Sequence, residues 1–573
     1  MQLESHFRTD RAARYSSVNI RWTWAAAAAA LVAWSLIQAG VFSGQTLINT
    51  GGWTLVLRFA QAALHPQLSP EFLTLTLHSA LITLGYAICG TSLSLIIGLI
   101  GGMLSSEIWW QAMSPTRHGR AIWWTVRAGL SVPRAIHEVI WGIFFVNILG
   151  LNPLVAILAI ALPFGAITAK VFSEILDEMP RAPLRALLNN GASPFAAFFY
   201  SILPQSIPNI LSYTFYRLEC SIRSAAVLGV IGAGGLGYQL WLSFQSLRYD
   251  EMWTFIFALI ALSGAVDIWS SQLRRRFSGR VRLEAAACQS APLTTKPAYR
   301  RDRAVTLSLI VMAILIPLSF WYVQADFGTL FAPRAAKLFV RVISDSFPPA
   351  LDGVLLKELS HQTIQTFAIS ILAITLAGAG GLLFSFPAAQ NRLTLTGVLN
   401  PQDHKVKTLL ILVPTRLALL TLRAIPASVW ALLLLFVLFP GVLPGALALG
   451  IYTLGILGRL MAEVIESLDE RPLIALRSCG ASGAQIFFYG VLPRAMPLFL
   501  SNILYRWEVC ARETVIIGVV GAAGLGRVLA EQLSNFDYPG MTTTLLFFIA
   551  LTVFVDVIGV FARRSMQLVI VQK

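Results

Sequence analysis

Six ionisable residues lie inside two strongly apolar stretches and could handle a charged solute. They form two triplets with the same spacing, Arg217, Glu219, Arg223 and Arg506, Glu508, Arg512. Helical residues four apart share a face, so Glu219 can hold Arg223 while Arg217 points about 160° away from Glu219. A guanidinium fork matches the oxygens of an oxyanion, and four arginines against two glutamates predict a positive lining of about +2. The alternative is that these charges only pair to fasten a helix bundle, or snorkel to an interface.

The two triplets belong to a long internal repeat. Residues 191–237 return at 480–526 with a constant offset of 289 positions. A repeat of this size indicates a duplicated module. One position changes charge, because Glu513 stands where the first copy has Ser224, so the two halves are not expected to be functionally equal there.

The composition predicts that helices crossing a membrane position these residues. The chain has 573 residues, 56% hydrophobic and only 12% charged, against roughly 25% charged in soluble domains. Basic residues of membrane proteins concentrate in cytoplasmic loops, so the net charge of +15 does not indicate nucleic-acid binding. The five cysteines form no CxxC pair and the seven histidines show no HExxH spacing, so neither predicts a metal site.

Apolar segments predict about twelve transmembrane helices in two sets of six. The expected spans lie near 24–41, 77–104, 129–149, 152–172, 209–231 and 252–271, then near 304–325, 362–386, 414–438, 442–461, 498–520 and 541–562. We therefore expect an all-α polytopic membrane protein with a first repeat at 1–271, a basic linker at 272–303 and a second repeat at 304–573. Nine of the 43 Lys and Arg residues lie in that linker. The positive-inside rule places the linker and both termini in the cytoplasm. Six spans per half give parallel repeats about a pseudo-twofold axis along the membrane normal.

The loops at 174–208 and 463–497 each predict two short helices in an elbow that could seat in a soluble partner. Their pattern resembles the cytoplasmic loop of ABC importer permeases, which reads Glu-Ala-Ala, then Gly, then Leu-Pro. The residues that match are Arg185, Ala186, Gly191, Leu203, Pro204 and Ala475, Gly480, Leu492, Pro493. Both copies lack the Glu, so any salt link made by that residue is not implied here.

A longer set of motifs is similar to the phosphonate importer permeases. It comprises Gly-Ala-Ser, Leu-Pro, Tyr-Arg-x-Glu and a glycine-rich Leu-Gly turn in both halves, with Arg-Ala-Ile-His-Glu at 134–138 and Arg-Ala-Ile-Pro-Ala at 423–427. The resemblance covers most of both halves. It implies a fused, two-repeat form of a permease that is elsewhere built from two six-span subunits.

Glycine-rich turns follow both charged spans and predict tight packing, with a role in a gate. They contain Gly232, Gly234, Gly235 and Gly237 in the first half, and Gly521, Gly524 and Gly526 in the second. The first turn also fits GxGxxG, but no βαβ pattern surrounds it and Ala523 replaces Gly234 in the second copy. No GxxxxGK[ST] occurs in the sequence, so ATP is expected on another subunit.

We therefore expect a permease subunit of a bacterial inner-membrane ABC importer, which is not itself an enzyme and carries no cofactor. The resemblance implies two copies of an ATPase subunit and a periplasmic binding protein as partners, within membrane lipid. The expected cargo is a phosphonate or a related small phosphorus oxyanion such as phosphite. A secondary transporter with parallel repeats, an importer permease for a different small solute, and a membrane-embedded enzyme remain the alternatives, the last without a catalytic constellation to support it.

Overall fold

The computed structural model describes residues 23–42, 46–114, 116–290, 303–390, 405–469 and 471–571. The described residues form helices joined by short turns, with one isolated β-bridge between Ile48 and Leu438. The chain divides into two compact units, 59–345 and the combination of 1–58 with 346–573. The sequence repeats and the compact units therefore differ, because each unit includes the first span of the other repeat.

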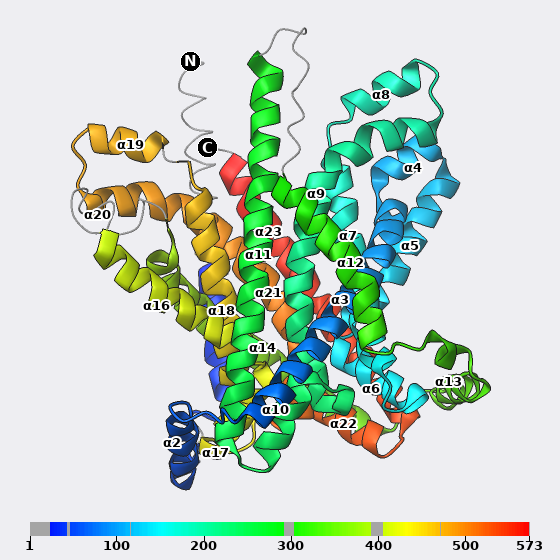
Figure 1. Ribbon diagram of the computed structural model, residues 1–573, viewed down its shortest axis with the longest axis vertical. Coiled ribbons are helices and arrows are strands. Elements are labelled where there is room, and N and C mark those ends of the chain that lie inside the picture. Colours follow the sequence, from blue (N-terminus) through cyan, green and yellow to red (C-terminus); the bar gives the residue numbers. More distant parts are fainter. Residues whose placement is uncertain are drawn as a thin grey trace. The chain divides into compact units, whose positions relative to one another are not determined.

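The unit 59–345 is built around a long helix, α3. Its elements are α3 (Pro70–Ser105), α4 (Glu107–Met113), α5 (Arg117–Ala135), α6 (Glu138–Leu149), α7 (Pro153–Asp177), α8 (Ala182–Asn189), α9 (Pro194–Leu228), η2 (Gly229–Ala233), α10 (Gly235–Gln245), α11 (Tyr249–Ser290), α12 (Arg303–Tyr322), η3 (Phe327–Phe331) and α13 (Pro333–Asp345) (Figure 1). Gly90 and Gly98 of α3 meet Ile160 and Thr168 of α7, where an added Cβ would lie 2.7 and 2.4 Å from their side chains. Small residues allow this close approach of membrane helices.

The other unit repeats this plan around α14. Its elements are η1 (Thr50–Gly52), α14 (Gly353–Ala388), α16 (Lys405–Ala424), α17 (Ala427–Val437), α18 (Val442–Ser467), α19 (Arg471–Ser478), α20 (Gly483–Gln485), η4 (Ile486–Val491), α21 (Leu492–Val519), α22 (Leu525–Ser534) and α23 (Tyr538–Val571). The helix α2 (Trp53–Ala62) crosses the division between the units. Glycines again mediate the main helix pair, since Gly381 of α14 packs on Leu457 of α18 and Gly450 of α18 on Leu376.

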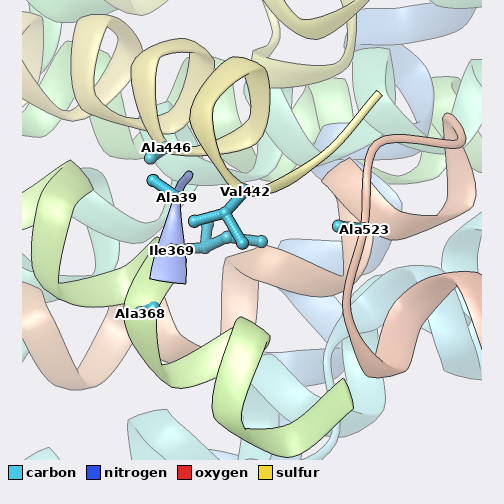
Figure 2. Close-up of a cluster of buried hydrophobic side chains, with 6 residues drawn as sticks. All are labelled: Ala39, Ala368, Ile369, Val442, Ala446 and Ala523. Atoms are coloured by element: carbon cyan, nitrogen blue, oxygen red, sulfur yellow. The ribbon is translucent and has the colours of Figure 1, made fainter. Parts of the chain in front are cut away.

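Each first span packs on the other repeat's helices. The helix Thr23–Gln38 places Trp34 against Phe367, with ring centroids 6.0 Å apart. At its end, Ala39 lies beside Ile369, Val442 and Ala446 in a buried apolar cluster (Figure 2). The helix α12 packs on α3, and Tyr322 is 2.8 Å from Nδ1 of His78.

Eight helices are long and apolar enough to cross a membrane, and three bent pairs raise the number to eleven in the described residues. The shorter apolar helix Thr23–Gln38 lies where the first of the twelve spans was expected. The all-α polytopic fold is therefore confirmed.

Two spans expected as straight helices are broken. The predicted span 129–149 comprises α5 and α6 at 85°, and 414–438 comprises α16 and α17 at 88°. A tryptophan from the second helix ties down each bend, since the indole N–H of Trp141 donates to the Pro133 carbonyl and that of Trp430 to the Leu422 carbonyl. These bonds satisfy carbonyls that a helix end leaves open.

Other boundaries also differ from the sequence prediction. The span expected at 252–271 continues as α11 to Ser290, into the segment predicted as linker, whose residues 291–302 lie outside the described part. In the first half, the second helix of the elbow and the span expected from 209 form one helix, α9, which runs through Pro204 and Pro208. The prolines remove the N–H donors for the Tyr200 and Pro204 carbonyls, while the Gln205 side chain donates to the neighbouring Ser201 carbonyl at 2.7 Å.

Candidate functional site

The charged triplets lie on α9 and α21; Arg223 is half-buried and the other five residues are buried. Arg217 and Glu219 are 8% and 5% exposed, and Arg506, Glu508 and Arg512 are between 4% and 9% exposed. The expected pairing one turn apart is present, with 3.3 Å between Arg223 and Glu219 and 3.6 Å between Arg512 and Glu508. In the second half Glu508 also lies 3.8 Å from Arg563 of α23, a contact that sequence spacing alone could not identify.

The remaining arginine of each triplet has a different neighbour in each half. The guanidinium of Arg217 lies over the ring of Phe164, 3.8 Å from its centroid. Its counterpart Arg506 donates to both oxygens of Glu513, at 2.8 and 3.0 Å. Thr453 stands at the position of Phe164, so the second half offers no aromatic face there. Glu513, at the position of Ser224, thus gives Arg506 an ion pair along α21.

The sequence prediction missed a buried carboxylate in the first half, Glu138. It is the first residue of α6, 9% exposed, and its Oε1 accepts the Ser224 hydroxyl at 2.6 Å. Its Oε2 lies 3.3 Å from Nε2 of His137. A charged residue at the start of the apolar run 139–149 was the available signal.

These two further acids change the predicted charge of the site. The six residues alone carry four arginines and two glutamates, but Glu138 and Glu513 add one carboxylate to each half. With Arg563 beside Glu508, the triplets and their charged neighbours carry five arginines and four carboxylates, so the positive excess is smaller than the expected +2.

The predicted elbows are present and expose the expected residues. Gly191 and Gly480 turn the chain with φ of 84° and 83°, values that favour glycine. Arg185, Ala186 and Ala475 are exposed, as are both glycines and the prolines Pro204 and Pro493, while Leu203 and Leu492 are half-buried. Tyr200 and its counterpart Tyr489 are 81% and 78% exposed, so each elbow presents an aromatic side chain that the sequence analysis did not select.

The first elbow is anchored to its unit through α4. Ile108 of α4 packs in a buried cluster with Leu184 of α8 and Phe198 of α9. Asp177, at the end of α7, caps α4 by accepting the Ser106 hydroxyl at 2.7 Å and the Ile108 N–H at 3.0 Å. Movement of α8 therefore acts on packed helices rather than on a detached loop.

The glycine-rich turns are tight, as expected. Gly232, Gly234, Gly235, Gly521 and Gly524 all have φ between 74° and 96°. The other two glycines permit close approach, since an added Cβ would lie 1.8 Å from the Ala226 carbonyl oxygen at Gly237 and 2.6 Å from that of Val515 at Gly526. Their role in a gate remains a prediction.

Threonines fasten both turns to the long helices. Thr83 of α3 accepts the Leu236 N–H at 2.8 Å, and Thr366 of α14 accepts the Leu525 N–H at 2.9 Å. In the second half Gln362 also accepts the Gly524 N–H at 3.1 Å. The first N–H groups of α10 and α22 are thus occupied by the protein itself.

Comparison with known proteins places both halves in one family. The pattern of the binding-protein-dependent transport system inner membrane component matches residues 109–283 and 415–568. The chain is 27% identical to the phosphate-import permease protein PhnE of Mycolicibacterium smegmatis over 82% of this chain and 81% of that protein. It is 31% identical to the phosphite transport system permease protein PtxC of Stutzerimonas stutzeri over 45% of this chain and 88% of that one.

A third relative matches a shorter region. The putative cryptic phosphonate transport system permease protein PhnE2 of Escherichia coli is 39% identical over 19% of this chain and 87% of its own length. The family pattern occurs twice and covers more than half of the sequence, on helices that carry the elbow and the buried charges in each half. The chain therefore belongs to the family of binding-protein-dependent transport system inner membrane components.

Proposed function

We propose that the chain is the permease subunit of an ATP-driven importer that carries a phosphonate or a related phosphorus oxyanion, such as phosphite, from the periplasm into the cytoplasm. Inorganic phosphate joins the candidate cargoes because a relative that aligns with both halves is named for phosphate import. The chain lies in the bacterial inner membrane, with its termini and elbows on the cytoplasmic side. A separate ATPase, present in two copies, binds ATP, and a periplasmic binding protein delivers the cargo.

One observation carries the mechanism. In each half, the helical segment at the end of the elbow continues without a loop into the helix that holds the charged triplet. In the first half the second helix of the elbow is the start of α9 at Pro194, and the same continuous helix carries Arg217, Glu219 and Arg223. In the second half α20 and η4 lead into α21, which carries Arg506, Glu508 and Arg512. A displacement of an elbow by an ATPase is therefore transmitted to the charged level without an intervening loop.

The buried charges then serve to handle the oxyanion in stages. Glu219 and Glu508 hold Arg223 and Arg512 while the pathway is closed. Guanidinium groups bind phosphorus oxyanions through paired N–H donors, so an entering oxyanion competes with the carboxylate for the same arginine. The arginine is paired before and after this exchange, while the carboxylate that it releases needs another partner; in the second half Arg563 lies 3.8 Å from Glu508.

The test is uptake into proteoliposomes that contain the chain, its ATPase and its binding protein. Radiolabelled methylphosphonate, phosphite and phosphate are compared, with ATP supplied on the ATPase side. We expect ATP-dependent accumulation of at least one of them. Accumulation driven by an ion gradient without the ATPase would favour the secondary transporter, and failure of all three probes would contradict the proposed cargo class.

Arg223→Gln and Arg512→Gln test the proposed pathway. Each variant is expected to lower uptake at least tenfold while the ATPase still co-purifies. Lys170→Gln is the matched control, because it removes a positive charge from α7 and leaves both triplets unchanged. Normal uptake by both arginine variants would exclude an arginine-dependent pathway.

A further inference from the structure

In the first half a hydrogen bond joins α9 to α6, and the second half has no counterpart of it at the matching positions. This bond lies at the end of α9 that is far from the elbow. Ser224 follows Pro194, the first residue of α9, by 30 positions, which corresponds to about 45 Å of helix. The hydroxyl of Ser224 donates to Glu138 of α6 at 2.6 Å. The two ends of one continuous helix therefore contact the elbow and the start of α6.

Glu138 is held on both of its oxygens. Oε1 accepts from Ser224 and Oε2 faces Nε2 of His137 at 3.3 Å. The N–H of Val139 donates to Nδ1 of His137 at 3.2 Å, which leaves the proton of a neutral imidazole on Nε2. His137 thus both caps α6 and orients the Glu138 carboxylate. The hydroxyl of Ser224 therefore donates to a carboxylate that is held in place.

The contact between α6 and α9 continues one turn further along both helices. Gly142 lies four residues after Glu138 and packs on Leu228, four residues after Ser224, where an added Cβ would be 2.9 Å from Leu228 and 2.4 Å from Ile231. The matching steps show that α6 and α9 run side by side at this point. The hydrogen bond is therefore the polar end of a packed interface.

From this interface α6 leads to a second surface helix. Phe144 of α6 packs edge-on against Phe339 of α13, with ring centroids 6.4 Å apart. The helix α13 has a basic, exposed side with Arg334, Lys337 and Arg341. A continuous line of contacts thus joins the elbow, α9, α6 and α13 within one unit.

The second half cannot form the same bond. Ala427 stands at the position of Glu138 and carries no polar group, and Glu513 at the position of Ser224 binds Arg506 of its own helix. Ala431 also replaces Gly142, which adds a methyl group to the interface. The second half keeps a buried carboxylate at this level but directs it along α21 instead of across to α17.

We propose that Glu138 and Ser224 are positioning residues that fasten α6 to α9, so that movement of the first elbow is passed to α6 and α13. This inference rests on the proposed function, since the movement is the one that the ATPase drives. The two halves then work unequally: the first passes movement of α9 across to α6 and on to α13, and the second keeps its charge pair within α21.

The test measures transported probe per ATP hydrolysed in the complete transporter, with phosphite and methylphosphonate as probes. Ser224→Ala is expected to retain ATP hydrolysis but lower the ratio at least fivefold. Ser224→Thr keeps the hydroxyl and Glu138→Gln keeps a carbonyl acceptor, so both are expected to stay within twofold of the unaltered chain. Thr214→Val is the control, because Thr214 donates within α9 to the Ile210 carbonyl and precedes Ser224 by ten residues, about 15 Å along the helix.

The double variant E138A/S224E separates the bond from the charge. It moves the carboxylate onto α9, as in the second half, and removes its cross-helix partner. We expect it to be as uncoupled as Ser224→Ala. A normal ratio in both variants would overturn the proposal, as would a lowered ratio in Ser224→Thr when the ATPase still co-purifies.

A second readout does not depend on the cargo. Spin labels at Asn190→Cys, on the elbow, and Ser344→Cys, on α13, report whether their separation changes when ATP binds. We expect a change in the unaltered background and a change of less than half that size with Ser224→Ala. Equal changes would overturn the inference, whereas failure of every phosphorus probe with an intact distance change would contradict only the proposed cargo.

Discussion

The two halves agree at their elbows and glycine turns and differ at the buried charges between them. Gly191 and Gly480 have nearly the same φ, and Thr83 and Thr366 cap the two turns in the same way. At the charged level, however, Arg217 lies on Phe164 while Arg506 binds Glu513. The elbow surfaces, which would meet two copies of one ATPase, are alike in the two halves. The buried arginines have different neighbours.

Each half has a buried carboxylate close to the charged triplet, but the two halves carry it on different helices. The first half places it on α6 as Glu138 beside Ser224, and the second places it on α21 as Glu513, with Ala427 at the position of Glu138. An uncompensated buried charge is strongly destabilising. A tandem chain can accumulate such paired changes, because each half is free to differ from the other.

The largest expected effect comes from Glu513→Ser, which gives the second half the residue of the first. Arg506 loses both hydrogen bonds to Glu513 without gaining the aromatic face that Phe164 provides. Breaking one side of a buried ion pair costs about 3–5 kcal/mol. Thermal unfolding in detergent should show a large drop, and Glu513→Gln, which keeps an acceptor, a smaller one. An unchanged unfolding temperature for Glu513→Ser would mean that the pair contributes little.

The glycine turns predict the next largest difference. Gly237→Ala places a Cβ against a backbone carbonyl at 1.8 Å, and Gly526→Ala does so at 2.6 Å. Overpacking against backbone costs about 1–3 kcal/mol, so we expect the first variant near the top of that range and the second near the bottom. Gly129→Ala is the control, with no atom within 4 Å of the new Cβ. A larger loss of thermal stability for Gly526→Ala would reverse the comparison.

The threonine caps should give a smaller and still unequal effect. Thr83→Ala removes the acceptor for the Leu236 N–H, and Thr366→Ala that for the Leu525 N–H, at about 1 kcal/mol each. The second turn keeps its bond from Gly524 to Gln362, so Thr366→Ala should have the milder effect on hydrogen exchange of its turn. Faster exchange in Thr366→Ala than in Thr83→Ala would contradict this.

The smallest effect on stability is expected at the elbows, where the halves match. Tyr200→Ala and Tyr489→Ala remove side chains that are 81% and 78% exposed, which costs less than about 0.5 kcal/mol. Both should instead weaken co-purification of the ATPase, and by similar factors. Unequal losses would show that the two elbows do not dock in the same way.

Much of the fold follows from the sequence because its signals are local or repeated. The offset of 289 positions identified both elbows, and their glycines have the positive φ that the pattern predicted. The pairing of Glu219 with Arg223 followed from helix geometry alone. Hydropathy placed the spans but could not detect the bends of 85° and 88°, because an apolar average carries no direction.

The rest depends on contacts between distant segments. The exchange of first spans joins Trp34 to Phe367, and nothing in either local sequence indicates it. The caps Thr83 and Thr366 are 283 positions apart, so the constant offset could not pair them. Glu138 was visible as an acid beside an apolar run, but its partner Ser224 lies 86 residues away.

The sidedness of the elbows tests the central claim most directly. Cys479 is exposed beside Gly480 and reports on the second elbow, with Cys288 replaced by Ser. Asn190→Cys, at the matching position and also exposed, reports on the first elbow when Cys479 is replaced as well. In right-side-out vesicles an impermeant maleimide should leave both sites unmodified until the membrane is opened. Labelling of one elbow in intact vesicles would place the two elbows on opposite sides, and no pair of ATPases on one side could then drive both halves.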